Sequence, residues 1–370
     1  MATIKEKMEA GGFTTGFDYL RIGLSIAVLV WHSFNLSDGS HELDVARWSG
    51  PWRFLPASII PMFFALSGFL VTGSLLRVRL HQFITLRLVR LIPALAVEVT
   101  LSALIIGVAF TTLPIGEYLC SPEVRAYFLN IVGVIQYELP GVFVNNPNPL
   151  IINSQLWTIP FELECYAALI FLSVTGIVRV RAAFVAALLV LGIALTAQAV
   201  LTHNIRMDTS VPGRSMVMAF LIAVAVYLYR DRIPVSPVWG AASLVISAFL
   251  LGIPECVFLA MVPLVYATVW LGLMRPPPIP FGDLSYGVYL FHYPIEQTLV
   301  HLFPALRTPW ALSLTSLPIT AVFAWLSWTL IERPLLLRKK SILKATDRVF
   351  DATIGRWLGF AKARLAAISN

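Results

Sequence analysis

Phe17-Asp-Tyr-Leu-Arg21-Ile-Gly-Leu-Ser-Ile-Ala-Val-Leu-Val-Trp31-His32 is an apolar stretch with an arginine near one end and a histidine at the other. His32 follows Arg21 by eleven positions, close to three helical turns, so the two side chains face nearly the same way, roughly 16 Å apart along the axis. This stripe would cover half of a bilayer about 30 Å thick. Ionisable groups at that depth are functional candidates by default. The plainer alternative is that Arg21 reaches the interface and His32 satisfies a backbone group.

The composition is that of a membrane protein. Of 370 residues, 58% are hydrophobic and 13% are charged, against about 25% charged in soluble domains. The apolar runs lie at 17–34, 54–76, 91–110, 156–178, 182–201, 215–229, 236–252, 255–273, 284–303 and 310–331. The sequence therefore predicts an all-α integral membrane protein with about ten transmembrane helices.

The distribution of Lys and Arg predicts the orientation. With a cytosolic N-terminus and ten spans, 21 of the 27 Lys and Arg residues fall on the cytosolic side and 6 on the outer side. We therefore expect both termini in the cytosol and the chain in a bacterial inner membrane. The net charge of +7 reflects this bias and anionic lipid, so it does not indicate a nucleic-acid partner.

Two regions are distinguished by composition. Residues 1–334 form one predicted membrane domain, whose longest outer segment, 111–155, is expected to be structured, with a short helix near 123–137. Residues 335–370 form a basic cytosolic tail with apolar residues at roughly helical spacing, which predicts an amphipathic helix on the membrane surface. Such helices are more often anchors than sites. Those apolar residues are Phe350, Ile354, Trp357, Leu358, Phe360 and Leu365.

Several common catalytic arrangements are missing from the sequence. There is no GxSxG, Walker loop, GxGxxG or HExxH pattern. The three cysteines are scattered, and neither they nor the loop histidines have metal-ligand spacing. We therefore expect no metal cofactor.

Arg87 and Arg90 are three residues apart, so they share a helix face at the expected inner end of the third run. Two forked guanidiniums suit phosphate oxygens. The alternative is ordinary positive flanking of a membrane span.

Glu162 lies about one turn inside the fourth run, where a buried carboxylate needs a partner or a proton. The predicted topology places both Glu162 and His32 in the outer half, so the carboxylate could orient the imidazole. Glu164 points elsewhere on the helix and pairs with an arginine or lines a polar cavity.

His292 is a second intramembrane histidine, and its plain interpretation is a hydrogen-bonded structural residue. Gly68, next to Ser67, marks a point where helices or a ligand approach closely. Glu332 and Arg333 are expected to form an ion pair at the inner face.

Six short motifs occur in an order that resembles the membrane acyltransferase-3 family over roughly residues 17–334. They are Asp18-Tyr-Leu-Arg21 with His32, Phe64-Ala-Leu-Ser67-Gly68-Phe-Leu, Arg87-x-x-Arg90, Leu156-Trp157-x-x-Pro160-x-Glu162-x-x-x-Tyr166, Ser285-Tyr286-x-x-Tyr289-Leu-x-His292-x-Pro294 and Glu332-Arg333-Pro334. Tyr19 stands where glycine is more usual. Many relatives carry an additional esterase-like domain, and we expect this chain to be the stand-alone form.

The resemblance implies a ten-helix fold, an acyl-CoA donor and a sugar hydroxyl as acceptor. It implies essential roles for Arg21, His32, Arg87, Arg90 and Glu162. The other motif residues would bind substrate or support the site: Asp18, Ser67, Trp157, Tyr166, Ser285, Tyr286 and His292.

The sequence is thus interpreted as an O-acyltransferase that moves an acyl group, expected to be acetyl, from cytosolic acyl-CoA to an extracytoplasmic or lipid-linked glycan. Arg87 and Arg90 would hold the CoA phosphates, Arg21 would line the path of the pantetheine arm, and His32 would be the general base. Glu162 would orient and charge that imidazole. The main alternative is a transporter or flippase for a glycan or lipid, and a third is a membrane scaffold for glycan synthesis. A covalent acyl intermediate stays open.

Overall fold

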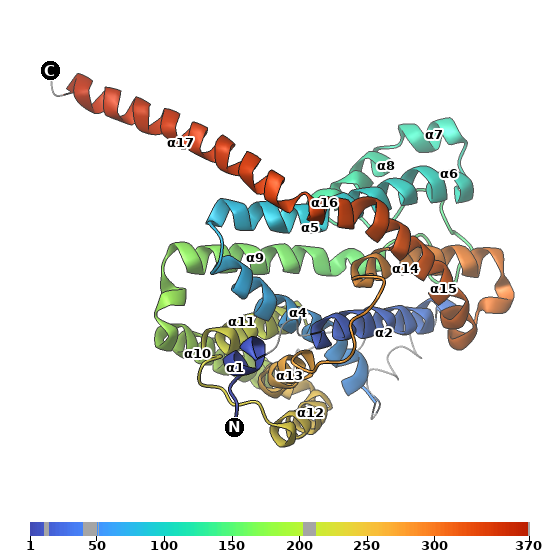
Figure 1. The fold of residues 1–370 in the computed structure, drawn as a ribbon. Coiled ribbons are helices and arrows are strands. Elements are labelled where there is room, and N and C mark those ends of the chain that lie inside the picture. Colours follow the sequence, from blue (N-terminus) through green and yellow to red (C-terminus); the bar gives the residue numbers. More distant parts are fainter. Residues whose placement is uncertain (11–14, 40–49, 51, 203–211, 369–370) are drawn as a thin grey trace.

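The computed structural model describes residues 1–10, 15–39, 50, 52–202 and 212–368, together with side chains through residue 353 apart from Asp38, Arg179 and Thr202. The regular structure of these residues is entirely helical (Figure 1). A short N-terminal helix, α1 (Ile4–Glu9), is closed by a capping box between Thr3 and Glu6.

A helix lies over every one of the ten predicted apolar runs. These helices are α2 (Gly16–Asp38), α4 (Phe54–Leu75), α5 (Leu80–Leu101), α9 (Ile159–Val174), α10 (Arg181–Thr202), α11 (Gly213–Leu228), α12 (Pro237–Leu251), α13 (Val257–Gly272), α14 (Ser285–Leu302) and α15 (Pro309–Ser327). Seven helical segments of the described chain are long and apolar enough to cross a membrane. α11 and α12 have only 16 and 15 residues. Ten spans and cytosolic termini therefore stay predictions.

The largest apolar core surrounds α4, which packs against α11, α13 and α2. Gly68 allows α4 and α11 to approach each other closely, because a Cβ atom at this position would lie 2.4 Å from the carbonyl oxygen of Phe220 on α11. The predicted close-contact role of Gly68 is confirmed as a helix–helix contact.

α14 packs between α2 and α15. Gly287 permits this packing, because a Cβ atom there would lie 2.6 Å from Cα of Ala324 on α15. Three titratable side chains of α14 and its N-terminal loop, Asp283, His292 and Glu296, thereby meet polar groups of neighbouring helices. α14 is the element that links the two ends of the site described below.

Residues 111–155 are structured, as predicted, and we keep the name outer segment for them. They follow α6 (Gly107–Phe110), which continues α5 through a π-helical turn (Ser102–Ile106). They contain α7 (Ile115–Cys120), α8 (Pro122–Tyr127) and a 3-10 helix (Phe128–Val132). The expected short helix near 123–137 is thus present but begins and ends earlier. Buried Tyr118, Tyr127 and Phe143 give the segment an apolar core shared with α5 and α14.

The chain closes with a π-helical turn (Trp328–Glu332), α16 (Arg333–Leu337) and α17 (Lys339–Ile368). Figure 1 shows α17 extending away from the bundle, with only its first part beside α5. Ile354, Trp357, Leu358, Phe360 and Leu365 have side chains outside the described residues, so placement of the tail on a membrane surface stays a prediction.

Candidate active site

A cavity of about 430 Å³ lies between α2, α4, α5, α9 and α14, within the size range of ligand pockets. Eight of the predicted site residues line it: Arg21, Ser67, Arg87, Arg90, Glu162, Tyr166, Ser285 and Tyr286. The cavity is elongated, because α4 contributes side chains from Ile60 to Ser74, roughly 21 Å along the helix. Segments far apart in the sequence thus converge on one space.

One end of this cavity is basic. Arg77, Arg87 and Lys339 line it, and none of them forms a salt bridge with an acidic residue in the described part of the chain. The Nε atom of Arg87 is buried without a hydrogen-bond partner there. Nε of Arg77 donates to the carbonyl oxygen of Gly73 at 2.7 Å, which directs its guanidinium. We call Arg77, Arg87 and Lys339 the basic end.

Arg90 has a different environment from Arg87. Its guanidinium donates to Asp283 at 2.8 Å and to Glu332 at 2.7 Å, and Arg21 donates to the same Asp283 oxygen at 3.1 Å. Asp18 lies 3.6 Å from Arg21 as well, so three carboxylates surround the two cations. This corrects one expectation, because Glu332 contacts Arg90 instead of its neighbour Arg333. Arg90 and Arg87 both line the cavity, but only the charge of Arg90 is offset by carboxylates within salt-bridge distance. Residues three apart diverge by about 60° around a helix, which sends the two side chains to different neighbours.

Glu162 lies in the wall of the cavity. It accepts a hydrogen bond from the Tyr166 hydroxyl one turn later on α9, and Ser67 of α4 bonds to the same tyrosine. Arg87 and Arg90 lie within electrostatic range of the carboxylate. Glu162 thus faces the arginine-rich part of the cavity.

The opposite end of the cavity is formed by Thr158 and Tyr289, and we call it the far end. The Tyr289 hydroxyl is bonded to Thr158 and donates to the carbonyl oxygen of Gln155. Its ring centroid lies 6.2 Å from that of His292. The far end therefore adjoins the histidines.

His32 and His292 form a stacked, hydrogen-bonded pair. Nδ1 of His32 lies 2.8 Å from Nε2 of His292, with ring centroids 5.0 Å apart. Nδ1 of His292 lies 3.0 Å from the carbonyl oxygen of Val288, which can only accept, so this nitrogen carries a proton. In a neutral pair Nε2 of His292 then accepts from Nδ1 of His32. Nε2 of His32 is left with a lone pair, the state that a general base needs.

The expected contact between Glu162 and His32 is absent among the described hydrogen bonds. The ring partner of His32 is His292, and the partner of Glu162 is Tyr166. Both predicted residues lie in the bundle interior as expected, but α14 is inserted beside α2 and supplies the nearer polar group. His32 itself is not among the side chains that line the cavity.

The outer segment holds α14 in place beside the histidine pair. Asn148 donates to the Tyr293 hydroxyl at 3.0 Å, and the Tyr293 ring packs edge-on against His32 at 5.2 Å. Gln297 donates to the carbonyl oxygens of Asn148 and Ile151. Sequence reasoning missed these contacts, although the Asn-rich patch at 145–148 was a usable signal.

The remaining predicted residues have supporting positions. Asp18 lies 3.6 Å from Arg21, and Ser285 donates to Asp283. The Tyr286 hydroxyl donates to the carbonyl oxygen of Leu91 at 2.9 Å. Trp157 lies outside the cavity and packs against Phe161. Sequence reasoning had not assigned Lys339, Tyr289 or Asp283 to the site.

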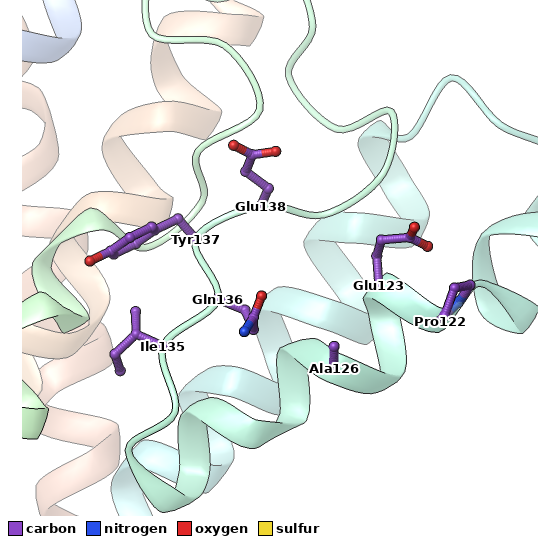
Figure 2. Close-up of a pocket in the computed structure, with 7 residues that line it drawn as sticks. All are labelled: Pro122, Glu123, Ala126, Ile135, Gln136, Tyr137 and Glu138. Carbon is purple, nitrogen blue, oxygen red and sulfur yellow. The ribbon is translucent and has the colours of Figure 1, made fainter.

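A second cavity, of about 400 Å³, opens in the outer segment between α8 and residues 135–138 (Figure 2). In Figure 2, Gln136 points toward α8, which carries Glu123. The cavity is lined by Pro122, Glu123, Ala126, Ile135, Gln136, Tyr137 and Glu138. Glu138 pairs with Ile151 in an antiparallel bridge, which connects this cavity to the segment that holds α14.

Comparison with known proteins agrees with the resemblance in the motifs. The sequence matches the acyltransferase domain family, acyltransferase-3, over residues 14–331. It is similar to nodulation protein 10 of Rhizobium leguminosarum bv. viciae, with 27% identity over 368 residues, covering 90% of this chain and 96% of that protein. It is also similar to an O-acetyl transferase of Shigella phage Sf6, with 25% identity over 341 residues, covering 87% and 96%. No solved structure matches at a significant level.

Proposed function

This chain belongs to the acyltransferase-3 family, and on that premise we propose that it transfers an acyl group, acetyl in the simplest case, from acyl-CoA to a hydroxyl of a glycan. The observation that carries the proposal is the cavity itself, which leads from the basic end to a wall beside a histidine pair. Phosphates suit the basic end, and a thioester would lie toward the far end.

The donor would enter at the basic end. Arg87 is the strongest candidate for a phosphate contact, because its guanidinium lines the cavity and its buried Nε lacks a partner in the described chain. The wall between the two ends combines apolar side chains, such as Phe63, Leu70 and Leu91, with polar ones, such as Ser67 and Tyr166. An uncharged pantetheine arm suits such a wall. In the orientation predicted from the positive-inside bias, this end would face the cytosol, where acyl-CoA is made.

Arg21 and Arg90 would shape the donor site instead of carrying the phosphate charge. Both donate to Asp283, and Arg90 also donates to Glu332, so carboxylates already offset their charges. A buried cluster of this kind fixes the positions of α2, α5 and α14 relative to one another. Their proposed role is to set the width of the cavity.

His32 would act as general base through Nε2. The acceptor oxygen forms a bond to the acyl carbon while the carbon–sulfur bond breaks. The hydroxyl proton passes to Nε2 of His32 and then to the departing CoA thiolate. His292 would hold the productive tautomer, the role first expected of Glu162. Tyr289 separates the far end from this pair, and its rotation would extend the cavity toward His32.

The acceptor would bind from the outer segment. The second cavity presents carboxylate, amide and phenol groups, which suit sugar hydroxyls and a sugar ring face. Its link through Glu138 and Ile151 to the loop beside Tyr293 supports this proposal, because an acceptor chain bound there would lie on the side of the histidine pair.

Release of free CoA thiol tests this function. Purified protein in detergent or nanodiscs is mixed with acetyl-CoA and a panel of glycans, and thiol is titrated over time. The proposal predicts slow release without acceptor and faster release with the right acceptor, both abolished in His32→Ala. A transporter or a scaffold would release no thiol above the His32→Ala background.

A further inference from the structure

Five cationic side chains line the main cavity, but their charges are not equally available. They are Arg21, Arg77, Arg87, Arg90 and Lys339. Asp283 and Glu332 neutralise Arg21 and Arg90. The other three cations face the cavity without a salt-bridge partner in the described chain, and Glu162 is the only acidic side chain in the lining. The basic end therefore carries excess positive charge.

Lys339 is brought to this end by docking of the tail. It is the first residue of α17, and α17 packs against the start of α5, the helix that carries Arg87. Asp347 lies 2.7 Å from Nε2 of His81 and accepts from Nε2 of Gln82 at 2.9 Å. These contacts fix the first part of the tail helix against the start of α5.

An aromatic contact strengthens the docking. The rings of His81 and Phe350 stack with centroids 4.0 Å apart. The hydroxyls of Thr85 and Thr346 lie 3.4 Å apart on the same interface. Because all these partners lie on one face of each helix, the first turns of α17 behave as part of the bundle, although the rest extends away from it (Figure 1).

We propose that the C-terminal tail completes the donor site: docked α17 places Lys339 beside Arg77 and Arg87, and the three cations together bind the phosphate groups of the acyl donor. The inference rests on the proposed function and extends it, because it gives the tail a part in substrate binding. The two forked guanidiniums can each hold a phosphate by two hydrogen bonds, while the lysine acts as a mobile point charge.

The phosphate could come from a second source, since basic groups near an inner membrane surface also attract anionic lipid headgroups. The two sources differ in a testable way. A donor contact depends on the phosphates of CoA and persists in purely zwitterionic lipid. A lipid contact requires anionic lipid, and its loss does not change the affinity for the donor in zwitterionic lipid.

The experiment compares Lys339→Ala and Arg77→Ala with two matched controls, Lys340→Ala and Arg338→Ala. The controls remove the same charges from neighbouring exposed positions that do not line the cavity. The full chain is placed in zwitterionic nanodiscs and in nanodiscs with anionic lipid. Binding of CoA, and KM for acetyl-CoA and for phosphate-free S-acetyl-pantetheine, are measured in both.

Loss of one charge-assisted contact should weaken CoA binding and raise KM for acetyl-CoA roughly tenfold in Lys339→Ala and Arg77→Ala. KM for S-acetyl-pantetheine should not change, and the controls should match wild type. If Lys339→Ala behaves like Lys340→Ala in both lipids, or differs from it only with anionic lipid, the tail does not bind the donor. If wild type itself neither binds CoA nor releases thiol, the proposed function fails as well, so the two failures are distinguishable.

Discussion

His292 accepts a hydrogen bond at Nε2 from Nδ1 of His32, over 2.8 Å, while its own Nδ1 is committed to the carbonyl oxygen of Val288. This relationship determines which nitrogen of His32 is free. A backbone carbonyl cannot donate, so the proton order of the neutral pair follows from a single fixed acceptor. The helix that bears His292 thereby sets the chemistry of a residue on another helix.

Removing the base should remove the activity. We expect His32→Ala to lower acyl transfer about 10²–10⁴-fold, the usual cost of losing a general base, with the protein still folded. Steady-state thiol release and size-exclusion profiles provide the two measurements. A variant that kept more than a tenth of wild-type turnover would show that His32 is not the base.

The role of His292 is predicted to be positioning. His292→Leu removes the acceptor of the His32 Nδ1 proton, and kcat should fall on the order of 10²-fold with donor KM unchanged, because the base then samples the wrong tautomer. His292→Gln keeps an acceptor oxygen and should recover a large part of kcat.

A double-variant cycle separates this role from a structural one. In the His32→Ala background, His292→Leu should cost no further rate, because the two residues act as one unit. An equal loss in both backgrounds would mean that His292 acts independently of His32.

Arg87 and Arg90 should fail in different ways. Arg87→Ala is expected to raise KM for acetyl-CoA at least tenfold with little effect on thermal stability, because it removes contacts that only the donor satisfies. Arg90→Ala leaves Asp283 and Glu332 without their shared cation, and breaking a buried pair costs about 3 kcal/mol. Thermal unfolding and donor kinetics of both variants test this. Equal loss of stability in the two variants would contradict the assignment of Arg87 to donor binding and of Arg90 to the buried ion-pair cluster.

The ten helices were predictable from the sequence because each corresponds to an apolar run, and such runs must be helical in a bilayer. The gathering of Arg21, Ser67 and Tyr166 around one cavity also agrees with the motifs. The partners could not be predicted. Arg87 and Arg90 are equivalent in the sequence, and only the approach of α14 and α15 decides which one meets carboxylates.

The positions of Lys339 and His292 also depend on contacts that the sequence could not predict. In the sequence, Lys339 is one of many basic residues near the C-terminus. Its position in the cavity lining depends on docking of α17 against α5. The plain interpretation of His292 as a hydrogen-bonded residue is correct, but its partner is a histidine on a helix 260 positions away in sequence. Contacts of that range depend on the packing of the whole bundle.

The second cavity is predicted to select the acceptor. Gln136→Ala and Glu123→Gln each remove hydrogen-bonding capacity toward sugar hydroxyls, so acceptor KM should rise about 2- to 10-fold, while thiol release without acceptor stays unchanged. Glu117→Gln is the matched control, since Glu117 is exposed on the adjacent α7 and does not line the cavity. Acceptor kinetics unaffected by both test variants would place the glycan elsewhere.

Docking of the tail should depend on the charge of Asp347. The hydrogen bond from His81, supported by that from Gln82, holds the pKa of this carboxyl below its usual value. The pKa of this carboxyl is lower in the docked state than in the undocked state. Its negative charge therefore stabilises docking at every pH above the undocked pKa. This stabilisation is lost as the pH falls through the docked pKa. The Asp347 contribution to docking should therefore be lost in strong acid, below the ordinary aspartate pKa of about 3.9.

Asp347→Asn tests this dependence at neutral pH, because it removes the charge that the contact stabilises. Spin labels on α5 and α17 should report a wider distance distribution for Asp347→Asn, whereas Asp351→Asn, whose pair with Arg79 is exposed and 4.0 Å long, should match wild type. Linking Thr85→Cys to Thr346→Cys by a disulfide should restore the narrow distribution in the Asp347→Asn background. If the labels report the same distances in Asp347→Asn and wild type, the carboxylate does not hold the tail against α5.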